Sequence, residues 1–500
     1  MRSPRPASLG PEAAGRPTRF GGLNRVESDR TVLERLREVC SEVSSNDSDR
    51  VDAGRDWWPL STVWAVEGYA PSLPAVVARP ASTSEVADVV RACNDAGVPV
   101  TAFAGASGVC GGSIPLFGGV SLDMSRLTGI VEVDQESLLV DVRAGTFGDQ
   151  LEEELRGDHG LTLGHWPQSI ALSTVVGWVA CRGAGQYSTR YGKIEDMVVS
   201  LEIVLADGRI IRTGGSSPRA ATGPDLTQLF VGSEGTLGVI TEARLRAHPV
   251  PVGESRAAYG FASFAQGLEA CRRILRRGAT PAVLRLYDPT ESARQFDADG
   301  VAVLIVIDEG DPGLIGAVME VVADECAAAT QLDQALAARW LEHRNSLPAL
   351  ESLVRAGIVA DTVEIAGSWK SLPGIYEQAV EELMAVEGII AASAHQSHAY
   401  SDGACLYFTF AGRTEAATVE SAETLYRRAF DAVTEPTIRA GGAISHHHGI
   451  GLNRAGYMRT QLGESMSVLQ SVKDALDRRG ILNPGKLGLT SPFGEGPSTP

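Results

Sequence analysis

Residues 231–241 read Val-Gly-Ser-Glu-Gly-Thr-Leu-Gly-Val-Ile-Thr, and this turn leads into a strand that we predict over residues 239–247. Glycine adopts the backbone conformations that tight turns need and lets a ligand approach the backbone closely. Three other segments rich in small residues precede this stretch. They are residues 104–112 (AGASGVCGG), 164–180 (GHWPQSIALSTVVGWVA) and 191–198 (YGKIEDMV). The order and spacing of these four segments decide our interpretation of the fold.

The first of these segments directly follows a strand predicted over residues 98–103. A strand that runs into a loop of Gly, Ala and Ser brings several backbone N–H groups together, and such a nest binds an anion. The alternative is an ordinary tight connection without a ligand. The loop does not spell G-x-G-x-x-G before a helix, and the chain has no G-x-x-x-x-G-K-[ST] segment. These two absences disfavour a Rossmann dehydrogenase and a P-loop nucleotidase.

Helical and strand-like segments alternate along the chain. Near residues 249–251 (Pro-Val-Pro) the order of these segments changes to a regular helix-strand-helix-strand pattern. Before this point, Ser82 and Glu85 form a capping box for a helix that Gly97 ends. After it, the sequence predicts strands over residues 283–286, 301–307 and 405–410. The pattern therefore predicts an α+β fold with two domains.

The composition restricts the function. The net charge is −18 and the sequence pI is about 5.0, which argues against a nucleic-acid partner because phosphate binding needs a basic surface. No stretch has the roughly 18 apolar residues that a membrane helix requires. Seven cysteines without a C-x-x-C pair fit a reducing cytoplasm rather than a disulfide or zinc framework. We expect a cytoplasmic enzyme with a small-molecule substrate.

Taken in order, the four segments resemble the FAD domain of the vanillyl-alcohol-oxidase/PCMH flavoprotein superfamily, and the similarity spans residues 57–490. The Gly-Ser-Glu-Gly-Thr-Leu-Gly run at 232–238 is the most characteristic block. The resemblance implies an α+β fold with a two-part PCMH-type FAD-binding domain and a substrate (cap) domain built on an antiparallel sheet. The implied units are a disordered tail with a short helix (1–50), the FAD-binding domain (51–250), the cap domain (251–435), a C-terminal segment that returns to the FAD domain (436–490), and a tail (491–500).

The same resemblance implies a set of FAD-binding residues. The first loop would hold the pyrophosphate, and the later blocks would surround the flavin and its ribityl chain. The implied residues are Ala104, Gly105, Ala106, Ser107, Gly108, Val109, Gln168, Ser169, Ser173, Thr174, Gly177, Cys181, Arg182, Gly183, Ala184, Glu234, Gly235, Thr236, Leu237, Gly238 and Ile240. The first loop contains no His or Cys that would link the flavin covalently, so we expect non-covalent FAD.

Within the superfamily, three further blocks resemble alkyl-dihydroxyacetone-phosphate synthase and its bacterial FAD-linked oxidase relatives. They are Ser-His-His-His-Gly-Ile-Gly at 445–451, Asp-Gly-Ala-Cys-Leu-Tyr-Phe at 402–408 and Ala-Val-Leu-Arg-Leu at 282–286. The resemblance implies that Tyr407 and the histidine triplet are the acid/base groups. Arg285 lies in an apolar strand, where an unpaired guanidinium is costly, so it forms a structural ion pair or holds an anionic substrate. The resemblance favours the second role.

The triplet can also be read from the residues alone. In an extended segment His446 and His448 would share one face and His447 would take the other. Each could be a hydrogen-bonded buried histidine, or it could titrate near neutrality and move a proton beside the flavin. His395 and His398 would add metal-ligand atoms. The segment lacks the carboxylate that accompanies such a metal in the lactate and glycolate dehydrogenases of the superfamily, so we expect no metal.

Three departures from the family pattern bear on the substrate. The first loop replaces a Gly-Gly-Gly-Thr-Ser-type run with Ala-Gly-Ala-Ser-Gly, and Gln168 stands where the synthase has an acidic residue. Leu350 stands where the synthase has an arginine, and Arg344 and Arg355 are the nearest replacements. This loss weakens the case for a phosphate-bearing lipid substrate.

Three functions therefore compete. The first is an FAD-dependent oxidoreductase that acts on a small, anionic hydroxy compound by hydride transfer to flavin N5. The second is a synthase-like exchange of an acyl for an alkoxy group through a flavin N5 adduct, without net redox. The third is a flavin-binding scaffold without turnover. The family resemblance also allows a homodimer.

Overall fold

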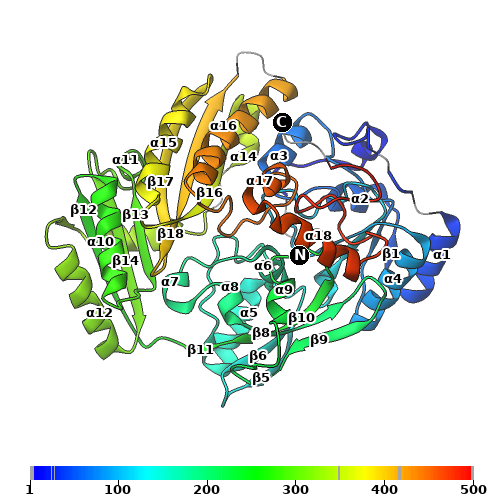
Figure 1. The fold of residues 1–500 in the computed structure, drawn as a ribbon, viewed down its shortest axis with the longest axis horizontal. Helices are drawn as coiled ribbons and strands as arrows, with labels where there is room; N and C mark the ends of the chain where they lie inside the picture. The colour runs from blue at the N-terminus through cyan, green and yellow to red at the C-terminus, as the bar shows by residue number, and fades with distance from the viewer. Residues whose placement is uncertain are drawn as a thin grey trace.

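The computed structural model describes residues 5–23, 25–27, 29–215, 217–346, 349–414 and 418–496. These residues build a mixed fold in which two small sheets lie on one side of the molecule and one large antiparallel sheet lies on the other (Figure 1). The α+β fold predicted from the sequence is confirmed. The outermost residues of the two predicted tails, 1–4 and 497–500, lie outside the described residues.

The first small sheet has four strands in the order β1-β2-β4-β3, with β2, β4 and β3 mutually parallel. Its strands are β1 (Val43–Ser44), β2 (Val76–Ala78), β3 (Val100–Phe103) and β4 (Val120–Asp123). The capping box predicted from the sequence is present in part, because the Ser82 side chain accepts a hydrogen bond from the Glu85 N–H and begins α4 (Thr83–Ala96). Gly97 ends this helix in the left-handed conformation, with φ of 68°. The helices α1 (Arg30–Val39) and α2 (Asp47–Ala53) also lie in this part of the molecule, and α3 (Pro59–Val66) packs against helices of the large sheet.

The second small sheet has five strands in the order β5-β6-β10-β8-β9. They are β5 (Ile130–Asp134), β6 (Leu139–Arg143), β8 (Val198–Val204), β9 (Ile210–Gly214) and β10 (Val239–Arg246). A two-stranded ribbon of β7 (Leu161–Thr162) and β11 (His248–Pro249) lies at its end. Short helices connect these strands: η2 (Met124–Arg126), α5 (Gly148–Glu154), η3 (Leu155–His159), α6 (Val175–Cys181), α7 (Ser188–Tyr191), α8 (Ile194–Met197) and α9 (Leu226–Phe230). Three of the four small-residue segments of the sequence (164–180, 191–198 and 231–241) lie in this region, and the first (104–112) lies between β3 and β4 of the other small sheet.

The large sheet has seven antiparallel strands in the order β15-β12-β14-β13-β17-β18-β16. They are β12 (Gly253–Phe261), β13 (Val283–Tyr287), β14 (Ala302–Gly310), β15 (Thr330–Leu332), β16 (Ile358–Ser368), β17 (Ile389–Ala399) and β18 (Gly403–Arg413). Its helices are α10 (Phe264–Arg276), α11 (Pro289–Phe296), α12 (Pro312–Glu325), α13 (Ala335–His343), α14 (Leu350–Arg355), α15 (Leu372–Ala385) and α16 (Val419–Arg439). The antiparallel sheet that the resemblance implied for the cap is therefore present.

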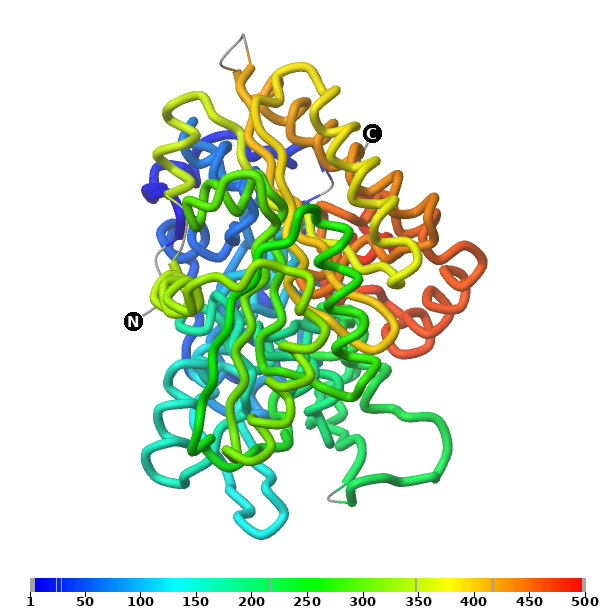
Figure 2. The backbone as a smooth tube through the Cα atoms, turned by 90° about the vertical axis from the view of Figure 1, so that its left-hand side faces the viewer, coloured from blue at the N-terminus to red at the C-terminus, as the bar shows by residue number. Residues whose placement is uncertain are grey.

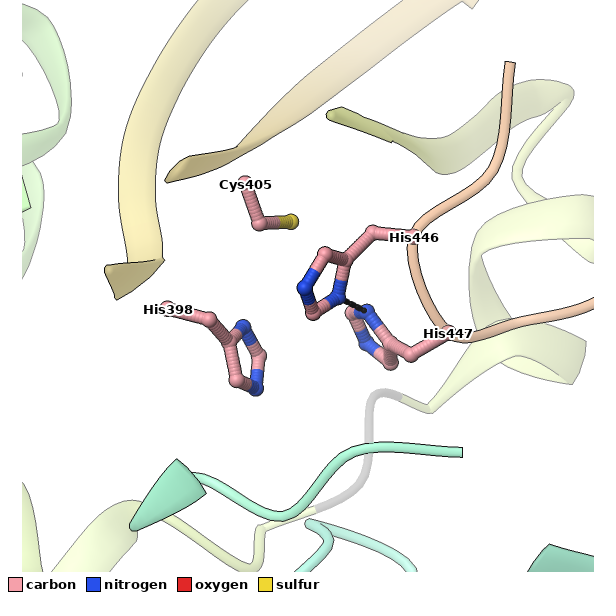
Figure 3. A group of neighbouring side chains, drawn as sticks. All are labelled: His398, Cys405, His446 and His447. Atoms are coloured by element: carbon pink, nitrogen blue, oxygen red, sulfur yellow. Dashed lines mark hydrogen bonds between the residues drawn. The ribbon is translucent and has the colours of Figure 1, made fainter. Parts of the chain in front are cut away.

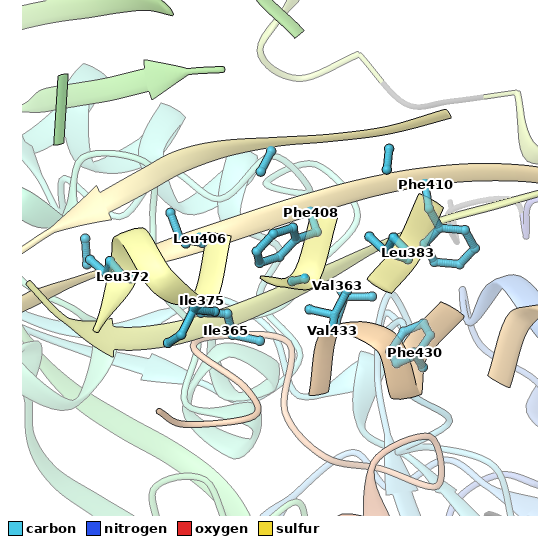
Figure 4. Close-up of a cluster of buried hydrophobic side chains, with 14 of the residues drawn as sticks. Val363, Ile365, Leu372, Ile375, Leu383, Leu406, Phe408, Phe410, Phe430 and Val433 are labelled. Carbon is cyan, nitrogen blue, oxygen red and sulfur yellow. The ribbon is translucent and has the colours of Figure 1, made fainter. Parts of the chain in front are cut away.

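One face of this sheet is buried under α15 and α16. The side chains that alternate along β16 and β18 pack against apolar residues of both helices (Figure 4). Val363, Phe408 and Leu383 are 0% exposed, and Phe430 is 3% exposed. Because successive strand residues point to opposite faces, this core fixes which residues of β16 and β18 point to the other face. Tyr407 and Glu364 are on those strands.

The C-terminal segment joins the two halves of the molecule. It contains η4 (Ala455–Tyr457), α17 (Met458–Leu462) and α18 (Ser465–Leu476), drawn in orange to red in Figures 1 and 2. A β-bridge pairs Ala443 with Ala366 of the large sheet, and another pairs Leu482 with Val100 of the first small sheet. The histidine triplet lies between these two bridges in the chain.

At the beginning of the chain, where the sequence predicts a disordered tail, several described residues are buried. The described residues of this tail include η1 (Pro11–Gly15), and Ala7, Ala13 and Phe20 are 2%, 1% and 5% exposed. Composition favoured disorder, but these three apolar residues find buried positions against the first half of the molecule. Among the described residues, no helix is long and apolar enough to cross a membrane.

Candidate active site

Tyr407 stands at the centre of the predicted acid/base set. In β18 it pairs with His395 of β17 on one side and with Glu364 of β16 on the other. Its ring stacks on the His395 ring at a centroid distance of 4.9 Å. Its hydroxyl accepts a hydrogen bond from Thr362 Oγ1 at 3.1 Å and lies 3.5 Å from His448 Nε2. Burial raises the pKa of Tyr407 above its usual value, so the phenol is protonated at neutral pH.

The histidine triplet is not extended, so the alternation of faces that an extended segment would give does not apply. Its backbone bends around the buried carboxylate of Glu364, which accepts hydrogen bonds from the backbone N–H groups of His446 and His448. Ser445 Oγ and Arg454 Nη1 each donate to the same carboxylate at 2.8 Å. Burial alone would raise the pKa of Glu364, but the charge of Arg454 and the hydrogen bond from the His446 N–H hold it well below its usual value. An ionised carboxylate therefore shapes the loop.

As a result, the three imidazoles lie close to one another and to Tyr407. His446 Nδ1 and His447 Nδ1 share a hydrogen bond of 3.0 Å, and His446 Nε2 bonds the Tyr400 hydroxyl at 3.0 Å. Burial lowers the pKa of His446 and of His447 to about 3, and that of His448 to about 4. The triplet is therefore neutral near pH 7 and can accept protons, provided that a nearby anion stabilises the charge.

Arg285 extends this group toward the cap. Its Nη2 lies 2.5 Å from His395 Nε2, and its Nε donates to the Tyr287 hydroxyl at 2.7 Å. Its guanidinium carbon lies 5.7 Å from the centroid of the Trp340 ring. Within the part of the chain that the structure describes, no carboxylate ion pair to Arg285 is found. The structural ion pair considered from the sequence is thus absent there, and the charge is available to an anion.

His398 and Cys405 complete a cluster with His446 and His447 (Figure 3). One ligand atom from each lies within 4.8 Å of the others, and a bulge in β17 between Gln396 and His398 turns His398 to this side. Imidazole nitrogen and cysteine sulfur are the ligands that Zn²⁺ prefers. His395, which we had considered together with His398, bonds Arg285 and Glu291 instead.

Glu234 joins the characteristic glycine-rich block to the triplet. Its carboxylate accepts hydrogen bonds from the backbone N–H groups of Ile450 and Gly451 at 2.6 and 2.8 Å. The Cys181 thiol also lies 3.9 Å from the His447 carbonyl oxygen. The Glu234 side chain therefore fixes the end of the histidine loop. The block predicted to bind FAD therefore also positions the predicted catalytic residues.

The predicted pyrophosphate loop has the geometry of a cradle. Gly105 packs so closely on the second segment that an added Cβ would lie 2.3 Å from the Leu172 carbonyl oxygen. Buried polar atoms around the loops have no hydrogen-bond partner in the protein, among them Trp57 Nε1, Ser113 Oγ and both ring nitrogens of His165. Buried polar groups are normally satisfied, so these atoms fit a polar ligand such as FAD. When bound, FAD would be held by the backbone N–H groups of residues 104–109 and by these side chains.

Other implied FAD residues have protein partners. Ser173 Oγ accepts from Trp178 Nε1 and donates to the Ser169 carbonyl, Thr174 begins α6, and Arg182 Nε donates to Glu195. Thr236 Oγ1 donates to Ser233, while Leu237 and Ile240 are core residues. Gln168 donates to the Ser346 carbonyl at 2.6 Å and so links this loop to the cap.

The remaining implied positions offer backbone groups: Ala104, Ala106, Ser107, Gly108, Val109, Gly177, Gly183, Ala184, Gly235 and Gly238. Their contact with FAD stays a prediction.

A cavity of about 660 Å³ opens beside the triplet. His446 and Tyr400 line it together with Ser188, Lys193 and Arg182. It therefore borders both the FAD-binding loops and the large sheet. A small substrate or solvent can reach the histidine cluster from this side.

Sequence reasoning missed four residues that organise the site: Glu364, Arg454, Tyr400 and Thr362. A glutamate inside the apolar run Thr-Val-Glu-Ile-Ala was a detectable signal for Glu364, because buried charges need partners. Arg454 is 0% exposed and lies in a polar loop, where no pattern separates it from a surface arginine. Tyr400 could not be identified without knowing that its hydroxyl contacts His446.

Comparisons with known proteins identify the family of the chain. Residues 74–214 match the FAD binding domain family, and residues 251–487 match the C-terminal domain of FAD linked oxidases. The chain is 32% identical over 487 residues to the "uncharacterized FAD-linked oxidoreductase YgcU" of Escherichia coli (strain K12), a match that covers 93% of this chain and 96% of that protein. It is 29% identical to alkyldihydroxyacetonephosphate synthase of Dictyostelium discoideum, over 84% of this chain and 74% of that one.

Solved structures give the same result. A structure of alkyldihydroxyacetonephosphate synthase superposes with a TM-score of 0.76 at 25% identity and covers 92% of this chain and 87% of its own. Substrate-bound p-cresol methylhydroxylase shares the fold, with a TM-score of 0.74 at 16% identity over 92% of this chain and 96% of its own. The chain therefore belongs to the FAD-linked oxidase family and is an FAD-dependent enzyme of the oxidoreductase or synthase type.

Proposed function

We propose that this protein is an FAD-dependent oxidoreductase that oxidises a small, anionic hydroxy compound. Bound FAD would supply the hydride acceptor at flavin N5. The protein would bind the anion, orient the carbinol and remove the hydroxyl proton.

The contact series Arg285–His395–Tyr407 carries the proposal. Arg285 bonds His395 at 2.5 Å, and the His395 ring stacks on Tyr407 at 4.9 Å. A guanidinium without a carboxylate ion pair among the described residues thus lies one imidazole away from a buried phenol. A 2-hydroxy acid carries a carboxylate next to its hydroxyl group, so it offers one function to the guanidinium and one to the phenol. Arg285 would bind the substrate carboxylate, and the Tyr407 hydroxyl would form a hydrogen bond with the substrate hydroxyl.

Tyr407 cannot act as a simple base, since burial keeps its phenol protonated. It can, however, accept the substrate proton while it passes its own proton to His448 Nε2, 3.5 Å away. The resulting imidazolium would be stabilised by Glu364, whose Oε1 lies 3.7 Å from His448 Nδ1. One proton enters at Tyr407 and one arrives at His448, in the manner of a carboxylate-supported histidine base. The neutral state of His448 at pH 7 makes it available for this step.

A synthase-like exchange of an acyl for an alkoxy group is the second candidate. The similarity to alkyldihydroxyacetonephosphate synthase in sequence and structure favours it. Leu350, where the synthase resemblance implies an arginine, lines a small apolar cavity with Pro59, Val63 and Tyr426. That surrounding offers no cation to a phosphate, which is why we rank the exchange second.

Turnover with a panel of 2-hydroxy acids and an artificial electron-accepting dye tests the proposal. We expect dye reduction by at least one acid, with a slower rate when the hydrogen on the carbinol carbon is replaced by deuterium. Acyl-dihydroxyacetone phosphate with a long-chain alcohol tests the alternative in parallel. Release of fatty acid without dye reduction would contradict the oxidoreductase and support the exchange.

A further inference from the structure

The segment before α1 lies outside both ranges that match family models, which begin at residue 74 and at residue 251. We call residues 5–23 the N-terminal strap. It runs from the predicted pyrophosphate loop to helix α16 of the large sheet. At its far end Arg19 makes two hydrogen bonds to the Glu423 carboxylate, at 2.7 and 2.8 Å, and Phe20 packs edge-on against Trp64. The strap is therefore anchored rather than loosely attached.

Arg5 lies at the near end of the strap. Its side chain is only 4% exposed, and its Nη1 donates to the Gly105 carbonyl at 2.9 Å. Its Nε is buried without a hydrogen-bond partner, and the nearest carboxylate oxygen in an ion pair, Asp52 Oδ1, is 3.6 Å away. Burying a guanidinium that has an unpaired N–H group costs folding free energy unless an anion accepts a hydrogen bond from that group.

A second buried arginine and several carboxylates surround Arg5. Arg55, whose Nη1 donates to the Ala7 carbonyl, is also a buried guanidinium with an unpartnered Nε. Burial and the charge of Arg5 lower the pKa of Arg55 to about 10, although Asp52 and Glu351 oppose this shift. Burial raises the pKa of Asp56 to about 6, which leaves this carboxylate ionised at neutral pH. The carboxylates therefore compensate the two charges in part, and the unpartnered Nε of Arg5 remains as an unused donor beside the predicted pyrophosphate loop.

We propose that Arg5 is a cofactor-binding residue whose guanidinium donates to the diphosphate of FAD from the side opposite the backbone N–H groups of residues 104–109. The N-terminal strap places it there. The charge of Arg5 would add electrostatic attraction for the diphosphate to a loop that has alanines where the family has two glycines. The inference rests on the assignment of residues 104–109 to the diphosphate.

Binding of FAD, ADP and riboflavin to the flavin-free protein tests this inference, because ADP retains the diphosphate and riboflavin lacks it. Arg5→Gln should weaken FAD and ADP binding by about tenfold and leave riboflavin binding unchanged, since a charge-assisted hydrogen bond contributes on this scale. Arg5→Lys should recover part of the loss. The release rate of FAD from the holoprotein, followed by the rise in flavin fluorescence, should increase for Arg5→Gln.

Two further variants separate the possible outcomes. Arg16→Gln changes an exposed arginine of the same strap and should not alter FAD or ADP binding. Ser107→Asp places a negative charge in the loop and should weaken ADP binding if the loop holds the diphosphate. Loss of ADP binding in Ser107→Asp but not in Arg5→Gln would overturn the role of Arg5 alone. An equal loss of riboflavin and ADP binding in Arg5→Gln, or unchanged FAD release, would also overturn it.

Discussion

Arg454 Nη1 donates to Glu364 Oε1 at 2.8 Å, and the two side chains are only 1% and 0% exposed. Arg454 follows the histidine triplet in the chain, whereas Glu364 lies in the middle of β16. The pair therefore holds the histidine loop against the large sheet. The start of the loop is also hydrogen-bonded to Ala366, and its end is hydrogen-bonded to Glu234. The ion pair therefore helps to position the histidine triplet beside Tyr407.

Removal of the Glu364 charge should disrupt the site. We expect Glu364→Gln to destabilise the protein by about 3–5 kcal/mol, because it leaves the Arg454 charge buried without its partner. Chemical unfolding measures the loss, and Glu377→Gln, an exposed glutamate of α15, is the matched control. Equal stability of Glu364→Gln and the control would show that the loop is held by other contacts.

The buried histidines should make stability depend on pH. His165, His446 and His447 have a pKa of about 3 in the folded protein, against about 6.5 in an unfolded chain. Between these values the unfolded chain binds more protons, so stability falls as the pH decreases from about 6.5 to 4. Each histidine contributes up to about 1.4 kcal/mol per pH unit.

Glu364 acts in a lower window, since its pKa is depressed and its contribution is lost only as the pH falls below about 4.5. Asp56 and Asp288, whose pKa burial raises to about 6, and Asp361, whose pKa it raises to about 7, titrate between pH 5 and pH 7.5 with the opposite sign, so the variants are compared with the unchanged protein over this range. We expect the slope of stability against pH to decrease in His447→Gln and to stay the same in His343→Gln, an exposed histidine of α13. An unchanged slope in His447→Gln would contradict the neutral state of His447.

Tyr407→Phe should remove the first proton acceptor and leave the fold intact. The hydroxyl bonds only Thr362 and His448 among the described residues, so its loss opens little space. We expect kcat to fall by about 10²–10⁴-fold, the contribution typical of general acid–base catalysis, with unchanged FAD binding. Tyr69→Phe alters a tyrosine that is 40% exposed and serves as the control. Full activity in Tyr407→Phe would remove Tyr407 from the mechanism.

Arg285 should control affinity for the anion. We expect Arg285→Gln to raise KM for the anionic substrate by about tenfold or more, because a charge-assisted contact is lost. Arg285→Lys should keep the charge but not the planar geometry, and it should recover part of the affinity. Steady-state kinetics separates this effect from that of Tyr407→Phe. A loss in kcat alone would indicate that Arg285 acts on chemistry through His395 rather than on binding.

Much of the fold could be predicted from the sequence because local signals agree with the tertiary structure. The capping serine Ser82, the left-handed Gly97 and the strand at Val239–Arg246 are where the sequence indicates. The long strands β16 and β17 were not predicted. Their partly exposed positions mix polar and apolar residues, as at 360–362, so the alternation is weak.

The site was predicted less completely, because its geometry depends on contacts between distant segments. Tyr407, Arg285 and the triplet were identified through family resemblance, and the structure places them in one contact network. The bend of the triplet could not be predicted, because it is imposed by Glu364 from β16, 82 residues away from His446. The bulge that turns His398 toward the cluster likewise has no signal in the sequence.

The most direct test of the proposed function is the absorbance of the bound flavin during anaerobic addition of 2-hydroxy acids and, separately, of acyl-dihydroxyacetone phosphate. We predict that a hydroxy acid bleaches the flavin band fully and that the Tyr407→Phe variant bleaches far more slowly. A flavin that responds only to the acyl ketone phosphate, and keeps its oxidised spectrum with every hydroxy acid, would contradict the account.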